Sequence, residues 1–262
     1  MKENPFLSDT FTKIWLKHFY SKKIPSCFSF IGGLSFIRPT LLPIYLNIGK
    51  THTKGISYFL SPGHEQDFKK KVFLIYDVPT FFDLDLINNK KYLKQVKLKQ
   101  YPGFLINLGN YTDFTHYFSS TFSKSSRYKL TKYKKRLESC FDISYKMYHG
   151  PMDREVYDHI FDCFKNLLKK RFLDKGISNN NLDPKEWNFY YEVAYPMILE
   201  NKASLFVIYN GNVPIGVTLN YFSENIVFDA ITVFDIDYEK FHLGSVTIMK
   251  LIEWSINQKF KY

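Results

Sequence analysis

The sequence predicts a mixed α/β protein, in the α+β sense that helices pack on a mixed sheet. Three observations support this class. Segments with strand character alternate with longer segments of helical periodicity between residues 141 and 257. Asn210-Gly211-Asn212 separates two strand-like runs, which is a strong hairpin signal. Hydrophobic residues make up 45% of the 262 residues, which is enough for a sizeable core.

The N-terminal part of the chain is expected to hold one helix followed by short strands. Residues 1–20 have the spacing of a short amphipathic helix, and residues 24–60 read as three short strands. Residues 70–79 predict a buried strand, and residues 84–104 predict a turn and a helix. Residues 103–109 predict the last strand of this part.

The C-terminal part begins with a strongly basic helix. Residues 113–137 predict one helix with Asp113 as its N-cap. One stripe of this helix is apolar, and cations cover the rest. The cations are Lys124, Arg127, Lys129, Lys132, Lys134, Lys135 and Arg136. A strand over residues 141–148 and a second helix over 153–172 follow.

A third helix is predicted to begin after Asp183. Asp183 can cap it, Pro184 suits its first turn, and Glu186 completes a capping box. Pro196 lacks a backbone N–H, so we expect it to kink or end this helix near Tyr195.

The last elements are a hairpin, a strand and a helix. Residues 204–222 predict the two hairpin strands, and residues 225–235 predict a third strand. The final helix carries Val246, Met249, Ile252 and Ile256 on one face. Gly244 stands where the loop after the third strand meets this helix.

Three stretches resemble one family. They are SKSSRYKLTKYKKRLE, LFVIYNGNVPIGVTLNYF and DIDYEKFHLGSVTIMKLIEW. Together they span roughly residues 110–262, and this part resembles the GNAT-type N-acyltransferases, more narrowly the subgroup allied to the Fem-type aminoacyltransferases. That subgroup pairs two such domains, so residues 1–109 are interpreted as a degenerate GNAT-like lobe and residues 110–262 as the acyltransferase lobe.

The resemblance also implies a further strand after the last helix. In relatives this strand splays from its neighbour and makes the slot for the thioester arm. We therefore expect residues 258–262 to begin that strand, and the C-terminal lobe to lack its last strands.

An acyl-CoA co-substrate, acetyl-CoA or a longer relative, is implied by the same resemblance. In the family, backbone N–H groups at a helix N-terminus bind the coenzyme pyrophosphate. Glycine allows close approach of the phosphate because it has no Cβ. The matching residues are Lys240, His242, Leu243, Gly244 and Ser245. The family signature is Arg or Gln, two residues, Gly, one residue, then Gly or Ala. This sequence departs from it on both sides of Gly244, with Phe241 in place of the Arg or Gln and Val246 in place of the second Gly or Ala.

The implied chemistry is direct attack of an amine on the thioester. The strand before the loop is expected to hold the donor carbonyl through the backbone of Ile231, Thr232 and Val233. A base removes the amine proton, and the nearby carboxylates are the candidates. They are Asp229, Asp235, Asp237 and Glu239, of which Asp229 is preferred. Tyr238 is the candidate acid that protonates the leaving thiolate.

Charge favours an anionic partner. Lys+Arg 36 against Asp+Glu 25 gives +11. The basic helix fits coenzyme phosphates, an anionic acceptor or a nucleic acid, and equally a solvated helix face whose side-chain stems cover the core. The amine acceptor is expected to be a small molecule or a cell-envelope component. A Fem-type enzyme that uses aminoacyl-tRNA, and a non-catalytic binding module, stay open as alternatives.

Other chemistries and locations find little support. The seven histidines form no metal motif, and the sequence contains no Walker loop and no G-x-S-x-G. Asp83 and Asp85 suit a cation or, more simply, a solvated turn. No run is long and apolar enough for a membrane span. Three scattered cysteines and no signal peptide suggest a cytoplasmic protein.

Overall fold

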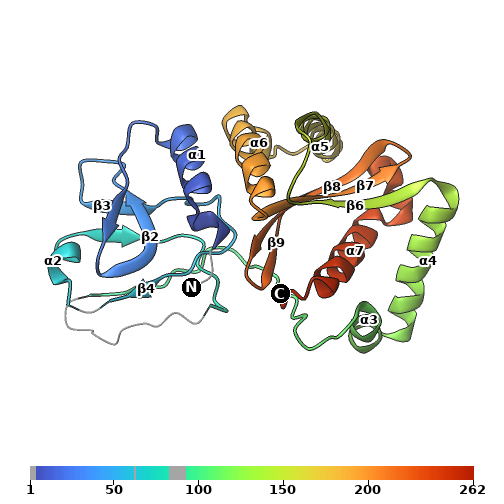
Figure 1. Cartoon of the computed structure of the whole chain (residues 1–262), viewed down its shortest axis with the longest axis horizontal. Coiled ribbons are helices and arrows are strands. Elements are labelled where there is room, and N and C mark those ends of the chain that lie inside the picture. The colour runs from blue at the N-terminus through green and yellow to red at the C-terminus, as the bar shows by residue number, and fades with distance from the viewer. Residues whose placement is uncertain (1–3, 62, 83–92) are drawn as a thin grey trace. The chain divides into compact units, whose positions relative to one another are not determined.

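The computed structural model describes residues 4–61, 63–82 and 93–262. Its internal contacts separate two compact units, Met1–Phe104 and Leu105–Tyr262 (Figure 1). Asp83 and Asp85, considered as a cation site or more simply a solvated turn, and part of the helix predicted over 84–104 lie outside the described residues.

The first unit contains short elements. They are η1 (Pro5–Leu7), α1 (Asp9–Phe19), β1 (Ser26–Phe28), β2 (Ile31–Ile37), β3 (Ile44–Asn47), β4 (Phe59–Leu60), α2 (Glu65–Phe68) and β5 (Val72–Leu74). Ser8 caps α1 by accepting a hydrogen bond from the Phe11 N–H. Phe11 and Trp15 lie on the buried face of this helix, as its amphipathic spacing predicted.

The sheet of the first unit is mixed. Its strands run in the order β1-β2-β3-β5, with β4 also paired to β2, and only the β3–β5 pair is parallel. Rings rather than aliphatic side chains fill one side, where Phe73 contacts Phe28, Phe30 and Phe36 at centroid distances of 4.9 to 5.2 Å.

Several predictions for the first unit need correction. Residues 24–60 hold four strands instead of three, because the short β4 pairs with the start of β2. The strand predicted as buried is only Val72–Leu74, and Val72 is 51% exposed because it lies on the edge strand of the sheet. The described residues 93–107 form neither the predicted helix nor the predicted strand, and Phe104 is 98% exposed. Without a neighbouring strand, apolar character alone does not make a strand.

Asp77 anchors residues 100–101 of this irregular segment to the first unit. This buried carboxylate accepts hydrogen bonds from the Thr51 N–H (2.8 Å), the Thr53 hydroxyl (2.9 Å) and the Tyr101 hydroxyl (3.0 Å). Burial of the Tyr101 hydroxyl, together with the adjacent carboxylate, raises the pKa of Tyr101 to about 12.

The second unit contains longer elements. They are α3 (Phe114–Thr121), α4 (Lys124–Cys140), β6 (Ile143–Tyr148), α5 (Arg154–Asp174), η2 (Asn180–Leu182), α6 (Pro184–Leu199), β7 (Ala203–Asn210), β8 (Val213–Ser223), β9 (Ile226–Phe234), η3 (Ile236–Phe241) and α7 (Leu243–Asn257). The four strands form an antiparallel sheet in the order β6-β7-β8-β9. The predicted hairpin is confirmed, since Asn210 pairs with Val213 around Gly211, which has φ of 56°.

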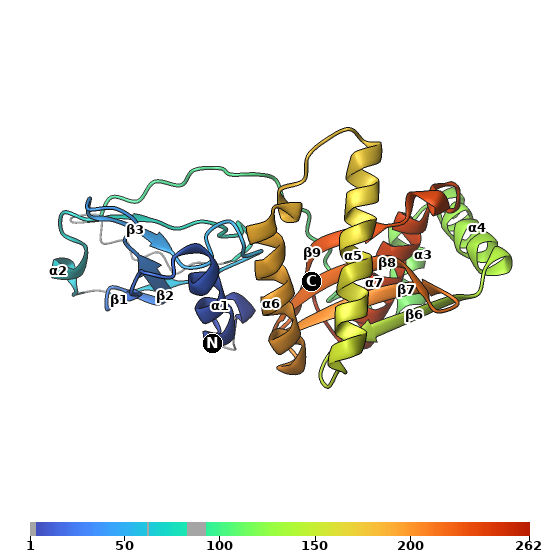
Figure 2. The same ribbon diagram turned by 90° about the horizontal axis from the view of Figure 1, so that it is seen from above.

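Helices cover both faces of this sheet. Figures 1 and 2 show α5 and α6 on one face, and α7 with α3 and α4 on the other. Alternate residues of β7 point to opposite faces. Phe206 and Ile208 point toward α7 and pack in one core cluster with Leu243 and Val246. Leu205 and Val207 therefore point toward α5 and α6.

The helix predicted over 113–137 is two helices. Asp113 caps α3 by accepting from the His116 N–H (2.8 Å), as predicted, but α3 stops before Phe122. Ser123 then caps α4 through the Ser126 N–H, and Arg127 donates to the carbonyls of Ser119 and Phe122. Ser123, a second N-cap residue inside the helical pattern, therefore marks the break between α3 and α4.

One prediction about α6 is wrong, and the structure excludes one of the two outcomes expected at Pro196. The Asp183 side chain makes no capping hydrogen bond, although the helix does begin at Pro184. Pro196 does not end the helix, which continues to Leu199. Val193 and Met197 are fully buried on either side of Pro196, so packing offsets the missing hydrogen bond.

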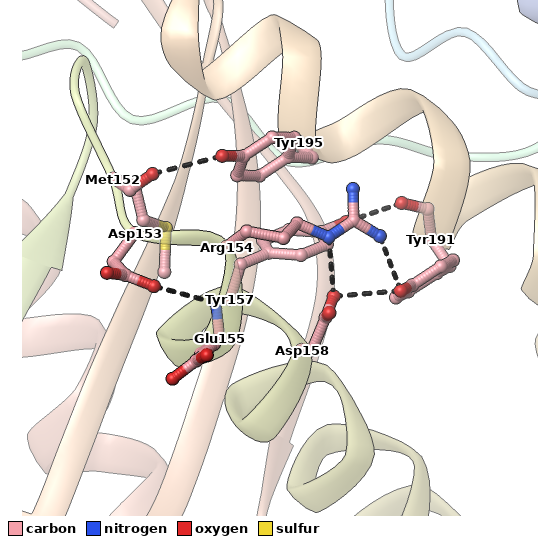
Figure 3. Close-up of polar contacts among 8 residues, drawn as sticks. All are labelled: Met152, Asp153, Arg154, Glu155, Tyr157, Asp158, Tyr191 and Tyr195. Atoms are coloured by element: carbon pink, nitrogen blue, oxygen red, sulfur yellow. Dashed lines mark hydrogen bonds and ion pairs between the residues drawn. The ribbon is translucent and has the colours of Figure 1, made fainter.

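A cluster around Arg154 joins the start of α5 to α6 (Figure 3). Its guanidinium bonds Asp158 (2.8 Å) and Tyr191 (2.5 Å), and Tyr191 donates to Asp158 (2.8 Å). The same guanidinium lies 4.7 to 5.3 Å from the ring centroids of Tyr157, Tyr191 and Tyr195. The hydrogen bond to Asp158 raises the pKa of Tyr191. The cluster therefore fixes how two supporting helices meet on one face of the sheet.

No regular strand is formed by residues 258–262, but the last residue begins to pair with β9 as the predicted strand would. The Tyr262 N–H donates to the Asn225 carbonyl, and the Tyr262 carbonyl accepts from the Val227 N–H (2.9 Å), which is the pattern of a parallel bridge. The Lys261 N–H donates to the same Asn225 carbonyl. These bonds occupy only the first residues of β9.

Candidate active site

The candidate site lies along β9, which forms an edge of the described sheet. The pairing with β8 shifts register between Leu219 and Asn220, so β9 carries a bulge at Ala230. Asp235 N–H bonds the Ile215 carbonyl of β8, and alternate residues of an antiparallel strand share that direction. Val233 and Ile231 therefore bond toward β8, whereas Thr232 directs its N–H and C=O outward. Thr232 is the one of the three predicted residues whose N–H can bind a donor carbonyl.

A row of polar side chains runs inward from the bulge. Thr232 Oγ1 donates to Asp229 Oδ1 (2.7 Å) and lies 3.1 Å from Thr218 Oγ1. Further in, Asn220 Nδ2 donates to Ser204 Oγ (3.3 Å). Thr218, Asn220 and Ser204 are fully buried, whereas Asp229 is exposed at the outer end. The row thus connects the solvent-facing carboxylate to the interior of the sheet.

Asn220 leaves one polar atom unsatisfied. Its Oδ1 is buried and has no hydrogen-bond partner among the described residues. A buried acceptor without a donor is unfavourable by about 1–3 kcal/mol, so native proteins rarely keep one without a reason. An N–H or O–H of a bound molecule would satisfy it.

The loop after β9 is held by an ion-pair cluster. Lys170 of α5 bonds Asp235 (2.5 Å) and Asp237 (2.6 Å) of the η3 segment. The hydrogen bond to Asp235, followed by that to Asp237, raises the pKa of Lys170. Two of the four carboxylates considered as bases are thus engaged by a cation, and Asp229 is the one that lies at the bulge.

Gly244 lies in the first turn of α7 and has a packing reason to be glycine. A Cβ built on it would come within 2.7 Å of the Phe234 ring. The sequence suggested that the missing side chain lets a phosphate approach, and the structure shows that it lets helix α7 approach β9. Ser245 and Val246 donate the first helical hydrogen bonds, both to the His242 carbonyl. The N–H groups of Leu243 and Gly244 precede those bonds, as at any helix N-terminus.

Aromatic and basic side chains surround this helix start. His242, the N-cap of α7, has φ of 54° and stacks on Tyr133 of α4 with ring centroids 3.8 Å apart. Arg136 and Lys240 lie 5.1 and 5.3 Å from the Phe241 ring. Arg171 lies 4.4 Å from the Phe234 ring. The start of α7 is therefore a positive region, in which the helix dipole adds to the side-chain charges.

Tyr238 lies elsewhere. Its hydroxyl accepts from Asn210 Nδ2 (2.9 Å) at the tip of the β7–β8 hairpin, and its ring packs on Phe141. Asp229 pairs with Asn220, seven residues along β8 from the hairpin partner Val213. At about 3.4 Å per residue these places are on the order of 20 Å apart. The structure does not bring Asp229 and Tyr238 together.

The family comparison decides the identity of this unit. The model of an acetyltransferase (GNAT) domain matches residues 124–262, more than half of the chain. The chain belongs to the GNAT acetyltransferase family. The GNAT match begins at the first residue of α4 and includes β9 and α7, the elements of the candidate site. No curated protein matches the chain.

The match confirms the GNAT-type resemblance, and the mixed α/β fold is confirmed with it. The Fem-type subgroup stays a prediction. The GNAT chain shows no helix, within the described residues, that is long and apolar enough to span a membrane.

Sequence reasoning missed the inner part of the polar row. Thr218 and Asn220 alternate with Val217 and Leu219 in a strand that was correctly predicted. Two polar residues at alternate positions indicate one polar face, but this pattern usually means a solvent-facing strand. Only the packing of α7 shows that this face is interior.

Proposed function

We propose that this GNAT protein is an acyl-CoA-dependent N-acyltransferase that moves an acetyl group, or a similar acyl group, to an amine. The observation that carries the proposal is the order bulged edge strand, loop and positive helix start within the family match. GNAT domains use acyl-CoA, and the two ends of this arrangement suit its two parts. The outward Thr232 N–H suits a thioester carbonyl, and the start of α7 suits phosphates.

The chain's own residues then divide the work. Leu243 and Gly244 would bind the pyrophosphate through their backbone N–H groups, with Ser245, Lys240 and His242 beside them. Thr232 N–H would stabilise the oxyanion that forms as the amine nitrogen attacks the carbonyl carbon. Asp229 accepts the proton that the amine loses, directly or through water. The new C–N bond forms, the C–S bond breaks, and the thiolate takes a proton from solvent, since Tyr238 is distant.

Calorimetry with acetyl-CoA tests the coenzyme part of this proposal. Gly244 is a poor position to mutate because any side chain there displaces Phe234. Ser245→Glu separates binding from stability better than a Gly244 variant does. An acidic residue in the first turn stabilises a helix by about 0.3–1 kcal/mol but repels phosphates. We expect unchanged or raised stability and at least tenfold weaker acetyl-CoA binding, with Ser245→Gln close to wild type. Absent binding to the wild-type protein would overturn the proposal.

A thiol-release assay over a panel of primary amines tests the transfer step. Asp229→Asn should retain acetyl-CoA binding and lose at least 100-fold in turnover, because the amide cannot take the amine proton. Equal turnover in Asp229→Asn and wild type would remove Asp229 from the mechanism. The acceptor class, small molecule or cell-envelope amine, follows from which amines release thiol.

The basic face of α4 supports the second candidate, a Fem-type transferase that takes its acyl group from aminoacyl-tRNA. Lys124, Lys132 and Lys135 are exposed beside Tyr128, which is 69% exposed, and cations around an aromatic ring suit single-stranded RNA. Retained RNA affinity with no acetyl-CoA binding would favour this candidate or a non-catalytic module. A cytoplasmic location is part of the main proposal and rests on the three free cysteines, Cys27, Cys140 and Cys163.

A further inference from the structure

Helix α4 carries a row of cations that the reaction itself does not use. Lys129, Lys132 and Arg136 are spaced i, i+3, i+7 and therefore form one stripe along the helix. All three are exposed. Like charges at this spacing destabilise a helix, so a bound group of opposite charge would stabilise α4.

The described residues do not supply that charge to the row. The ion pair formed within α4 joins Lys134 to Glu138 (3.4 Å), on the other flank of the helix. Across the loop, Asp235 and Asp237 are already paired with Lys170, which leaves Glu239 as the remaining acid of η3. With Lys240 included, four cations stand against Glu239 and the one excess negative charge of the Lys170 cluster.

Two ring contacts fix where this row lies. Tyr133, four residues after Lys129 and three before Arg136, stacks on His242 at the N-cap of α7. The Arg136 guanidinium lies 5.1 Å from the Phe241 ring in the turn just before that cap. The row therefore runs beside the start of α7, and seven residues of helix extend it over about 10 Å.

We infer that this row binds the 3′-phosphate of coenzyme A, an inference that rests on the proposed function. Coenzyme A carries its pyrophosphate and its 3′-phosphate on the same ribose, so a pyrophosphate at the start of α7 brings the 3′-phosphate next to α4. A phosphate monoester carries about −1.5 to −2 charges at pH 7, which matches two or three cations. Lys129, Lys132 and Arg136 would donate to its oxygens as charge-assisted hydrogen bonds. The chain would then distinguish coenzyme A from its 3′-dephospho form.

Competition between coenzyme A and 3′-dephospho-coenzyme A tests the inference by calorimetry at low salt. We expect the wild-type protein to bind coenzyme A at least about tenfold more tightly than 3′-dephospho-coenzyme A, because only coenzyme A has the phosphate that contacts the row. The ratio should fall toward one as salt screens these exposed charges.

A matched pair of variants locates the effect. Lys129→Gln with Lys132→Gln should abolish the preference and leave affinity for the dephospho form within about twofold. Lys124→Gln with Lys135→Gln removes the same charge from the outward side of α4 and should keep the preference. Arg136 is left intact because it packs on Phe241.

Three results would overturn the inference, and they are distinguishable. Equal affinity of the wild type for both coenzymes rejects the 3′-phosphate site and leaves the proposed function standing. Equal loss of preference in both double variants shows a general field rather than a site. If neither coenzyme binds the wild-type protein, both the 3′-phosphate site and the proposed function are rejected.

Discussion

The two faces of the second unit's sheet have different compositions. Leu205, Val207, Val217 and Leu219 point toward α5 and α6, and all four are fully buried and apolar. On the face toward α7, apolar residues occupy one end, where Phe206 and Ile208 pack on Leu243 and Val246. Farther along the same strands this face becomes polar, with Ser204, Thr218, Asn220 and Thr232.

This difference shows how one sheet can serve two purposes. The face toward α5 and α6 contributes stability, and the Arg154 cluster fixes those two helices over it (Figure 3). The face toward α7 gives up apolar packing next to the bulge, where the proposed chemistry takes place. Active sites commonly keep such locally unfavourable groups, and the rest of the fold compensates for them. The following predictions test this division.

The largest effect on stability is expected from Leu219→Ala on the apolar face. Removing three buried carbons and leaving a cavity should lower the free energy of unfolding by about 2–5 kcal/mol. Urea denaturation measures this loss. The folded variant should still bind acetyl-CoA within about threefold of wild type, because Leu219 points away from the site. A strong loss of binding in the folded variant would show that the two faces are not separable.

A smaller loss is expected from Gly244→Ala. The added Cβ must displace Phe234, and overpacking of this kind is unfavourable by about 1–3 kcal/mol. Alanine regains up to about 1 kcal/mol through its helix propensity. The net loss should be about 1–2 kcal/mol in chemical denaturation.

Phe234→Leu supplies the control for that substitution. A smaller side chain at position 234 should remove most of the penalty, and a double-mutant cycle measures the coupling. An equal loss from Gly244→Ala in both backgrounds would mean that the backbone, and not the Phe234 ring, requires the glycine.

Substitutions in the polar row should change stability little and acyl transfer strongly, whereas Leu219→Ala should do the reverse. Asn220→Leu combined with Ser204→Ala removes a hydrogen bond together with the unsatisfied oxygen, so stability should change by less than about 1.5 kcal/mol. Acyl transfer should fall at least tenfold if a bound molecule uses Asn220 Oδ1. A stability loss as large as that of Leu219→Ala, with transfer intact, would make the row purely structural.

The smallest effect is expected at Lys170. Its side chain is 39% exposed, so its two ion pairs should contribute no more than about 1 kcal/mol. The folded state raises the pKa of Lys170 above the ordinary 10.5, so this contribution is complete below pH 10.5 and disappears as pH rises through the folded pKa. The stability difference between wild type and Lys170→Met should thus be constant from pH 7 to about 10 and shrink above it. A difference that grows at high pH would contradict the assignment.

Much of the second unit follows from its sequence. The hairpin at Gly211, the order of its strands and helices, and the GNAT-type resemblance all depend on local patterns. Turn residues, caps and hydrophobic period act over a few positions, so the sequence displays them directly. The break before Ser123 was missed because a competing cap overrode the helical pattern. Whether the helix ends at Pro196 was left open, and tertiary packing decided that it continues.

The sequence by itself determined the family, the basic charge of α4 and the glycine at the start of α7. Only the tertiary structure decided what that glycine accommodates, which carboxylate lies beside the bulge, and that Tyr238 lies far from it. Those facts depend on which side chains meet across elements that are distant in sequence. Pairing register and helix packing set such meetings, and no local pattern encodes them.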